Sequence, residues 1–203
     1  MGGVGKAGGG DGRGAEDCQD LPVAAANRGR AADRGSNHMT ASAKEAGATV
    51  VRPVSWDDAA AVALREAMEE EMGARYADLL ASAPDYLPKG MNVEPETVVY
   101  TGIAYTGEGV PVGHVALRRL DGDLELKRMF VAPSHRGTDV ARALLAAAED
   151  AARALGAARV VLQTGHRQPD AVRLYEREGY APIPLFPPYE QLAGSHCFAK
   201  PLA

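Results

Sequence analysis

The chain has 203 residues, of which 46% are hydrophobic, and its formal net charge at pH 7 is −5. This length fits one domain with a tail, large enough to bury a core without disulfides or metals. The acidic balance argues against nucleic acid and anionic membranes as partners, because binding phosphates needs a basic surface. No apolar run approaches the roughly 18 residues of a membrane span, and the N-terminus lacks a secretory signal pattern.

Residues 1–46 are rich in Gly, Ala, Arg and Asp and show no hydrophobic period, so we expect a disordered tail. Within it, residues 35–39 read Gly-Ser-Asn-His-Met, which resembles a cloning scar, so part of the tail is expected to be non-native and Met39 is an alternative start. Residues 47–203 are expected to form one folded domain. Cys18 and Cys197 lie in such different segments that we predict no disulfide, which fits a cytoplasmic protein.

The first half of the domain is predicted to contain two helices and a three-stranded meander. We expect the first helix to begin at Ser55, with Asp58 in the capping-box position, and to end at Gly73. The Asp121-Gly122 pair predicts a tight turn between antiparallel strands. The predicted elements are strands over 48–53, 97–105, 110–120 and 123–132 and helices over 55–72 and 75–81.

The second half alternates helices and strands. Gly156 and Gly179 are expected to end its two helices, and a Pro-rich loop over 184–194 separates the last two strands. The predicted elements are helices over 140–155 and 169–178 and strands over 159–163, 180–184 and 196–200. The whole order predicts an α/β fold with a mixed sheet of about seven strands and flanking helices.

The segment Leu124–Leu145, LELKRMFVAPSHRGTDVARALL, runs from a strand through a tight loop into a helix start. The first N–H groups of such a helix have no partner within the helix, and the positive end of its dipole points the same way. Both features bind phosphate. The segment is therefore a physical reason to expect a ligand that carries a pyrophosphate.

A second segment, Gln168–Tyr180, reads QPDAVRLYEREGY. The two segments, in this order after a meander, resemble the GNAT acetyltransferases, whose motifs read Val-x-Pro-x-x-Arg/Gln-x-x-Gly-x-Gly/Ala and Asn-x-x-Ala-x-x-Leu-Tyr-x-x-x-Gly-Phe/Tyr. The resemblance covers about residues 48–203. It implies the acyl-CoA N-acyltransferase fold and transfer of acetyl from acetyl-CoA to a primary amine of a small molecule or amino acid. No metal is expected, because the spacing of the histidines does not suggest a metal site. The oligomeric state is left open, with a homodimer as one option.

The resemblance also implies which residues bind acetyl-CoA. The strand residues Met129, Phe130 and Val131 would pair with the pantetheine arm, and a bulge there would direct one N–H at the thioester oxygen. Gln168, in place of the usual Asn, and Ala171 belong to the second motif. The implied pyrophosphate loop consists of Arg136, Gly137, Thr138, Asp139, Val140 and Ala141.

Asp139 departs from the family pattern, because Gly usually stands there so that the backbone can approach phosphate closely. We favour the interpretation that Asp139 caps the following helix with its side chain turned away from the ligand. The alternative is a domain that holds CoA, or nothing, without turnover.

Tyr175 is expected to be the general acid and, by position, also a cofactor contact. Attack on a thioester expels a thiolate with a pKa of about 8.5, to which a phenol with a pKa of about 10 can donate a proton. The alternative is a core tyrosine. Glu125 is the expected base, because histone-type members of the family carry a glutamate at this offset before the motif arginine. We expect it to share a strand face with Lys127 and Met129; the alternative is a solvated carboxylate.

Other residues are weaker candidates. His114, His166 and His196 are alternative bases by their ordinary pKa. Phe186, Tyr189 and the segment Tyr86–Met91 are candidates for the acceptor pocket, or else they plug the edge of the core. A protein lysine or N-terminal acetyltransferase is a further alternative, which would need an open groove that the Pro-rich loop disfavours.

Overall fold

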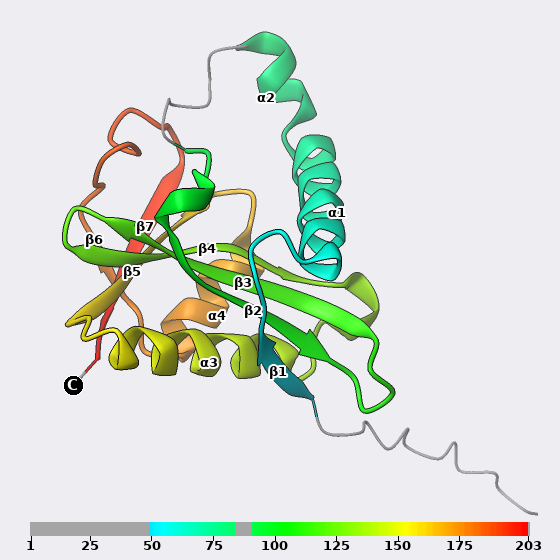
Figure 1. Ribbon diagram of the computed structural model, residues 1–203. Coiled ribbons are helices and arrows are strands. Elements are labelled where there is room, and N and C mark those ends of the chain that lie inside the picture. The colour runs from blue at the N-terminus through cyan, green and yellow to red at the C-terminus, as the bar shows by residue number, and fades with distance from the viewer. Residues whose placement is uncertain (1–48, 84–90, 203) are drawn as a thin grey trace, which may run out of the picture. The chain divides into compact units, whose positions relative to one another are not determined.

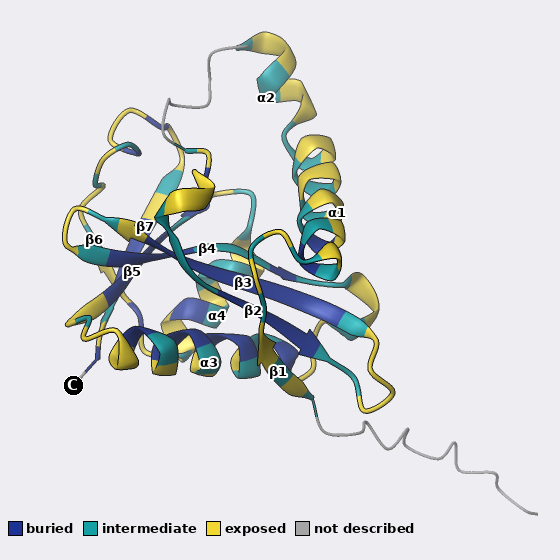
Figure 2. Cartoon of the chain, in the orientation of Figure 1, coloured by how far each residue is buried: buried dark blue, intermediate teal, exposed yellow. Residues whose placement is uncertain are grey.

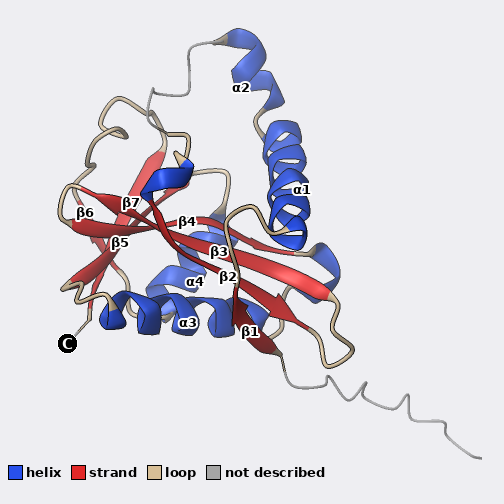
Figure 3. Ribbon diagram, viewed as in Figure 1, coloured by secondary structure: helices blue, strands red, loops and turns tan. Residues whose placement is uncertain are grey.

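The computed structural model of the protein describes residues 49–83 and 91–202 (Figure 1). The predicted tail, 1–46, lies outside these residues. The strands are β1 (Val50–Pro53), β2 (Val98–Tyr105), β3 (Pro111–Leu120), β4 (Asp123–Val131), β5 (Arg159–Gly165), β6 (Ala181–Ile183) and β7 (Ser195–Pro201). The helices are α1 (Ala59–Arg75), α2 (Ala77–Ser82), α3 (Val140–Ala154) and α4 (Pro169–Arg177), with 3-10 turns at Pro95–Thr97 and Pro133–His135. The predicted order of helices and strands is confirmed (Figure 3).

The strands form one mixed sheet in the order β1-β2-β3-β4-β5-β7-β6. Every neighbouring pair is antiparallel except β4 and β5, which are parallel and are connected through α3. β3 lies in the interior of the sheet and is buried over most of its length (Figure 2). The mixed seven-stranded sheet agrees with the fold expected from the sequence.

The parallel pairing of β4 and β5 is short. It joins Leu124 to Val160 and Leu126 to Leu162. Beyond Leu126, β4 continues to Val131 and β5 to Gly165, but the two strands are no longer paired there. The edge of β4 from Lys127 onward therefore presents main-chain groups to a gap within the described part of the sheet. Unpaired main-chain groups at a strand edge can pair with an added strand.

Helices cover both faces of the sheet. The main core cluster joins Leu144 and Leu145 of α3 and Tyr175 of α4 to one face. Ala61 and Leu64 of α1 pack against the other face. Successive side chains of a strand point to opposite faces of the sheet, so neighbouring residues of one strand belong to different core clusters.

A β-bulge interrupts β4 at Arg128, whose φ is +54°. His114 of β3 pairs with Phe130 and Ala116 pairs with Lys127, so two residues of β4 lie opposite one of β3. The extra residue shifts the alternation of side chains. Met129 packs on the α3 face, and the prediction that it shares a face with Glu125 and Lys127 is wrong.

The first helix differs at both ends from the prediction. The Asp58 carboxylate accepts from the N–H groups of Ala60 and Ala61 at 2.9 and 3.2 Å, so Asp58, not Ser55, is the N-cap. Gly73 does not end α1, which continues to Arg75. Arg75 is held there by bonds to Glu71 and to the Arg167 carbonyl, and these contacts offset the roughly 1 kcal/mol that an interior glycine costs. In the described ranges, no helix has the length and apolar character to span a bilayer.

Candidate active site

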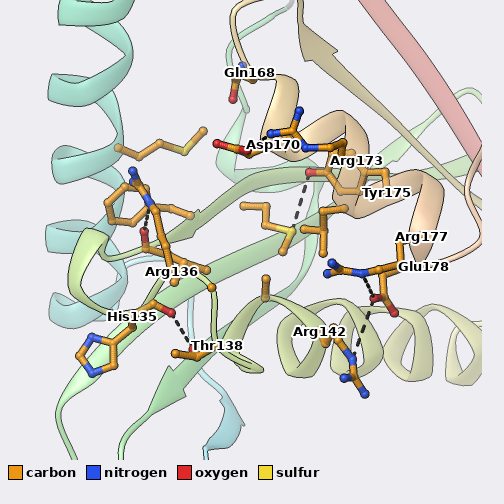
Figure 4. Close-up of a pocket in the computed structure, with 18 of the residues that line it drawn as sticks. His135, Arg136, Thr138, Arg142, Gln168, Asp170, Arg173, Tyr175, Arg177 and Glu178 are labelled. Atoms are coloured by element: carbon orange, nitrogen blue, oxygen red, sulfur yellow. Dashed lines mark hydrogen bonds and ion pairs between the residues drawn. The ribbon is translucent and has the colours of Figure 1, made fainter.

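A pocket of about 1220 Å³ lies among α1, the second half of β4, the loop before α3, and α4 (Figure 4). The structure brings together on its wall nearly all the residues predicted to bind acetyl-CoA. They are Met129, Phe130, Val131, Arg136, Gly137, Thr138, Asp139, Ala141, Gln168, Ala171 and Tyr175. Val140 is the exception, because its side chain is buried in the core between α3 and the sheet.

The start of α3 presents main-chain N–H groups at this pocket. Gly137 has a φ of +74°, a conformation that favours glycine, and lets the chain turn into the helix. The first main-chain bond of the helix runs from the Ala143 N–H to the Asp139 carbonyl, so the N–H groups just before it have no carbonyl partner within α3. The Thr138 hydroxyl donates to the His135 carbonyl at 2.6 Å and fixes the loop. This arrangement suits an anion.

Asp139 stands at the N-cap position, but its side chain makes no capping bond. Its φ and ψ, −74° and −3°, are already helical, whereas a capping side chain reaches back to the helix from an extended backbone. The predicted cap is therefore wrong. The carboxylate instead accepts from Arg142 at 3.1 Å, and its side chain is 84% exposed.

Arginines and carboxylates alternate around the pocket. Arg136 donates to the Val131 carbonyl at 3.0 Å and to Glu71 of α1 at 2.5 Å. Glu71 also accepts from Arg75 at 2.7 Å, so a single carboxylate holds two guanidinium groups at the rim. The remaining arginines of the wall are Arg142, Arg173 and Arg177. An anionic ligand would find these cations already placed by ion pairs.

Tyr175 belongs both to the core and to the pocket. Its ring packs against Tyr180 and Phe198, and the residue is only 6% exposed. Its hydroxyl lies 3.7 Å from the sulfur of Met129, across the pocket from α4 to β4 (Figure 4). Burial raises the pKa of Tyr175 above its usual value, so the phenol keeps its proton throughout the physiological pH range.

Glu125 does not line the pocket. It is fully buried, and its two oxygens accept from Arg118 Nε at 2.6 Å and from the Tyr189 hydroxyl at 2.5 Å. The alternative of a solvated carboxylate is thus wrong, because the loop that carries Tyr189 covers this face. Lys127 Nζ donates to the same hydroxyl at 2.8 Å, and burial lowers the pKa of Lys127 to about 8 against the opposing effect of Glu125.

None of the three alternative histidine bases lines the pocket. His114 is fully buried on β3, and burial lowers its pKa to about 4. His166 packs edge-on against Tyr76 at the end of α1. His196 is exposed on β7 and borders a different, smaller depression.

The acceptor candidates lie apart from the pocket wall. Tyr189 is fully buried and packs with Phe186, Leu192 and Cys197, as the core-edge alternative requires. Of the segment Tyr86–Met91, only Met91 is among the described residues, and it packs against this same cluster.

Sequence reasoning missed the contribution of α1 to the pocket. Met68, Glu71, Met72 and Arg75 form one stripe of that helix and line the wall. Their spacing of i, i+3, i+4 and i+7 is the signal that could have identified this face. The wall also includes residues that were not predicted as cofactor contacts, namely His135, Arg142, Asp170, Arg173, Leu174, Arg177 and Glu178. In residues 49–83 and 91–202, no cluster of three or more His, Cys, Asp or Glu is placed to hold a metal ion.

The chain is similar to known proteins in sequence and fold. A sequence profile of the Acetyltransferase (GNAT) family matches residues 61–180. The IAA acetyltransferase of Azospirillum brasilense is 32% identical over 133 residues, which make up 66% of this chain and 87% of the relative. A solved structure from Klebsiella pneumoniae subsp. pneumoniae, assigned to the acyl-CoA N-acyltransferases, is 29% identical with a TM-score of 0.61, over 76% of this chain and 98% of that one.

A more distant structure shares the fold. The PaiA N-acetyltransferase of Thermoplasma acidophilum, solved in complex with coenzyme A, is 16% identical with a TM-score of 0.55, over 76% of this chain and 99% of that one. Together with the family profile, which covers more than half of the chain, these relatives identify the protein as an acetyl-CoA-dependent acetyltransferase that belongs to the GNAT family.

Proposed function

We propose that the protein transfers the acetyl group of acetyl-CoA to a primary amine of a small molecule or amino acid, by direct attack in a ternary complex. One observation carries the proposal: a single pocket joins an unpaired strand edge, an open helix start and a buried tyrosine hydroxyl. These three features suit the three parts of the cofactor, which are its pantetheine arm, its diphosphate and its sulfur.

Binding begins with the charged end of the cofactor. The diphosphate would accept from the N–H groups at the start of α3 that have no carbonyl partner within the helix, and from Arg136, whose guanidinium already lies beside the loop. The pantetheine amides would pair with the edge of β4 between Met129 and Val131, where β5 has diverged. This places the thioester at the bulge, next to Tyr175.

The reaction forms a C–N bond and breaks the C–S bond. As the amine attacks, negative charge develops on the thioester oxygen, and a main-chain N–H at the bulge would stabilise it. Tyr175 then donates its proton to the departing thiolate. The amine gives up one proton to solvent, and solvent returns one proton to the tyrosinate, so that the phenol is restored. Proximity of the two bound substrates supplies much of the acceleration.

Glu125 and the three histidines considered as alternative bases, His114, His166 and His196, do not line the pocket. Only about one alkylamine molecule in 2,500 is neutral at pH 7, because the pKa of its ammonium form is about 10.4. We therefore propose that the acceptor reacts from its neutral form, without a dedicated enzyme base. Glu125 is assigned instead to holding Tyr189, and with it the loop over 184–194, against the sheet.

A CoA-binding module without turnover is the main rival, and Asp139 is the feature that favours it. The ion pair with Arg142 offsets the negative charge of the Asp139 carboxylate near a diphosphate. Because the carboxylate is exposed, solvent and salt screen its remaining repulsion. A protein acetyltransferase is the second rival.

The test is release of free CoA from acetyl-CoA by the full-length protein, measured with a thiol reagent against a panel of amines. We expect release that depends on at least one small primary amine. Tight binding of acetyl-CoA without amine-dependent release would establish the binding module, and acetylation of peptides alone would establish the protein acetyltransferase.

A further inference from the structure

The bulge in β4 holds a residue in a strained conformation. Arg128 has a φ of +54°, in the left-handed region, where a side chain other than glycine's is disfavoured. Such a residue persists only where its surroundings over-determine its position, and strained residues gather at functional sites. Arg128 comes directly before Met129, Phe130 and Val131, whose side chains and strand edge form the pocket wall.

His114 fixes the carbonyl of this strained residue. Its Nδ1 lies 2.8 Å from the Arg128 carbonyl oxygen, and its Nε2 lies 3.3 Å from Nη1 of Arg65. A guanidinium can only donate, so Nε2 must be the acceptor and Nδ1 must carry the proton. The imidazole is therefore neutral and donates to Arg128, in the tautomer that Arg65 sets.

Three further contacts hold Arg65 and Arg128, the two residues that flank His114 in this arrangement. Arg65 donates to the main-chain carbonyl of Trp56 at 2.8 Å and stacks 3.7 Å from the centre of the Trp56 ring, so it cannot easily turn away from His114. The Arg128 guanidinium donates to Glu69 of α1 at 2.8 Å. The strained residue is thus held at its carbonyl by β3 and at its side chain by α1.

We propose that His114 is a positioning residue for acetyl transfer: by holding the Arg128 carbonyl, it fixes the bulge so that a main-chain N–H of β4 faces the thioester oxygen. The inference rests on the proposed function, because it needs the thioester to lie at the bulge. His114 itself lies behind the strand and touches no substrate. Its effect passes through the hydrogen bond from the imidazole Nδ1 to the Arg128 carbonyl oxygen. This bond fixes the orientation of the peptide between Arg128 and Met129.

Two substitutions separate this role from packing. His114→Leu fills the buried space with an apolar side chain and removes the donor. His114→Asn leaves more empty space but places an amide N–H near the position of Nδ1. Both variants lose the contact with Arg65. They differ in whether residue 114 can donate a hydrogen bond to the Arg128 carbonyl. Thr101→Val is the matched control, because Thr101 is a buried polar residue on the neighbouring β2 and its hydroxyl has no hydrogen-bond partner in the described structure.

The readouts are kcat, KM for acetyl-CoA, the thermal midpoint, and amide hydrogen exchange across 127–131 in the free protein. We expect His114→Leu to lower kcat about ten- to a hundredfold with KM changed less than about threefold, because the bond acts on the transition state. We expect faster exchange at the bulge as well. His114→Asn should recover at least half of the loss in log kcat and slow the exchange, even where its thermal midpoint is lower. Thr101→Val should keep the wild-type kcat.

The opposite ranking would overturn the inference. If kcat follows the thermal midpoint, so that the leucine variant is the more active of the two, His114 only fills space. A His114→Leu variant with wild-type kcat and wild-type hydrogen exchange would also show that His114 does not position the bulge. Failure of the proposed function looks different, because the wild-type protein would then release no CoA in the presence of any amine, whereas the exchange at 127–131 would still report whether His114 holds the bulge.

Discussion

The Tyr175 hydroxyl of α4 lies 3.7 Å from the Met129 sulfur of β4, so the two sequence motifs meet across the pocket. Met129 occupies this face only because the bulge at Arg128 shifts the alternation of the strand. A proton donor from one motif is thus brought to the strand edge supplied by the other. The geometry predicts that the acetyl group and the departing sulfur would lie beside the Tyr175 hydroxyl and Met129.

Removal of that hydroxyl should affect chemistry and not binding. We expect Tyr175→Phe to lower kcat about a hundredfold or more, as loss of a general acid does, with the affinity for CoA nearly unchanged. Steady-state kinetics and calorimetry measure the two quantities. Tyr180→Phe is the matched control, because its buried ring packs on Tyr175 but does not line the pocket. An unchanged kcat in Tyr175→Phe would remove this residue from the mechanism.

Arg136 should contribute to binding of the diphosphate. Arg136→Ala is expected to weaken CoA about tenfold, because a charge-assisted contact is lost, and the loss should shrink at high salt. Arg153→Ala is a suitable control, since Arg153 lies in the last turn of α3, where the pocket does not reach. Equal affinities for the two variants in calorimetry would contradict the placement of the diphosphate at the start of α3.

The pH dependence of the rate tests the absence of an enzyme base. If the acceptor reacts from its neutral form, kcat/KM for an alkylamine should rise about tenfold per pH unit between pH 7 and 9. No falling limb from Tyr175 is expected there, because burial raises its pKa above the ordinary value. A plateau that begins near pH 7 would instead reveal a base on the protein.

Stability should fall with acid in a window set by His114. Burial lowers its folded pKa to about 4, whereas the unfolded value is about 6.5. The unfolded chain therefore binds a proton first, so the stability is complete above pH 6.5 and is lost as the pH falls toward 4. Arg65 and Arg128, the charged neighbours of the ring, oppose protonation in the same direction. Between pH 7.5 and 5, urea unfolding should show a loss of about 2 kcal/mol that is absent from His114→Asn; equal losses in both proteins would contradict it.

Glu125 should matter for folding more than for catalysis. Glu125→Gln leaves Arg118 and Lys127 without the buried carboxylate, and breaking such a pair costs about 3 to 5 kcal/mol. Denaturant unfolding measures this, with Glu94→Gln as an exposed control. A folded variant whose kcat falls more than a hundredfold would restore Glu125 as the general base.

The order of elements and most of the motif residues on the pocket wall could be predicted because their signals are local. A loop such as Arg136–Gly137 before a helix, or Gly179 after one, is encoded in a few neighbouring residues. Asp139 was misread because capping depends on φ and ψ at one residue, which the sequence does not give.

The remaining errors come from contacts between distant segments. Glu125 is covered by Tyr189, 64 residues later in the chain, and no periodicity within β4 announces this. The bulge is similar, since Arg128 takes its conformation with help from His114 on β3 and Glu69 on α1. Without knowledge of the bulge, the side chains of a strand are expected to alternate strictly between its two faces. This expectation puts Met129 on the wrong face.

The most direct test of the central claim is calorimetric titration of the full-length protein with coenzyme A. Binding of the diphosphate at the start of α3 and of the pantetheine arm along β4 predicts one site per chain with a Kd of about 1 µM to 1 mM, in the range of enzyme–substrate affinities. An absence of binding heat and of competition with acetyl-CoA at millimolar coenzyme A would contradict the assignment of this pocket.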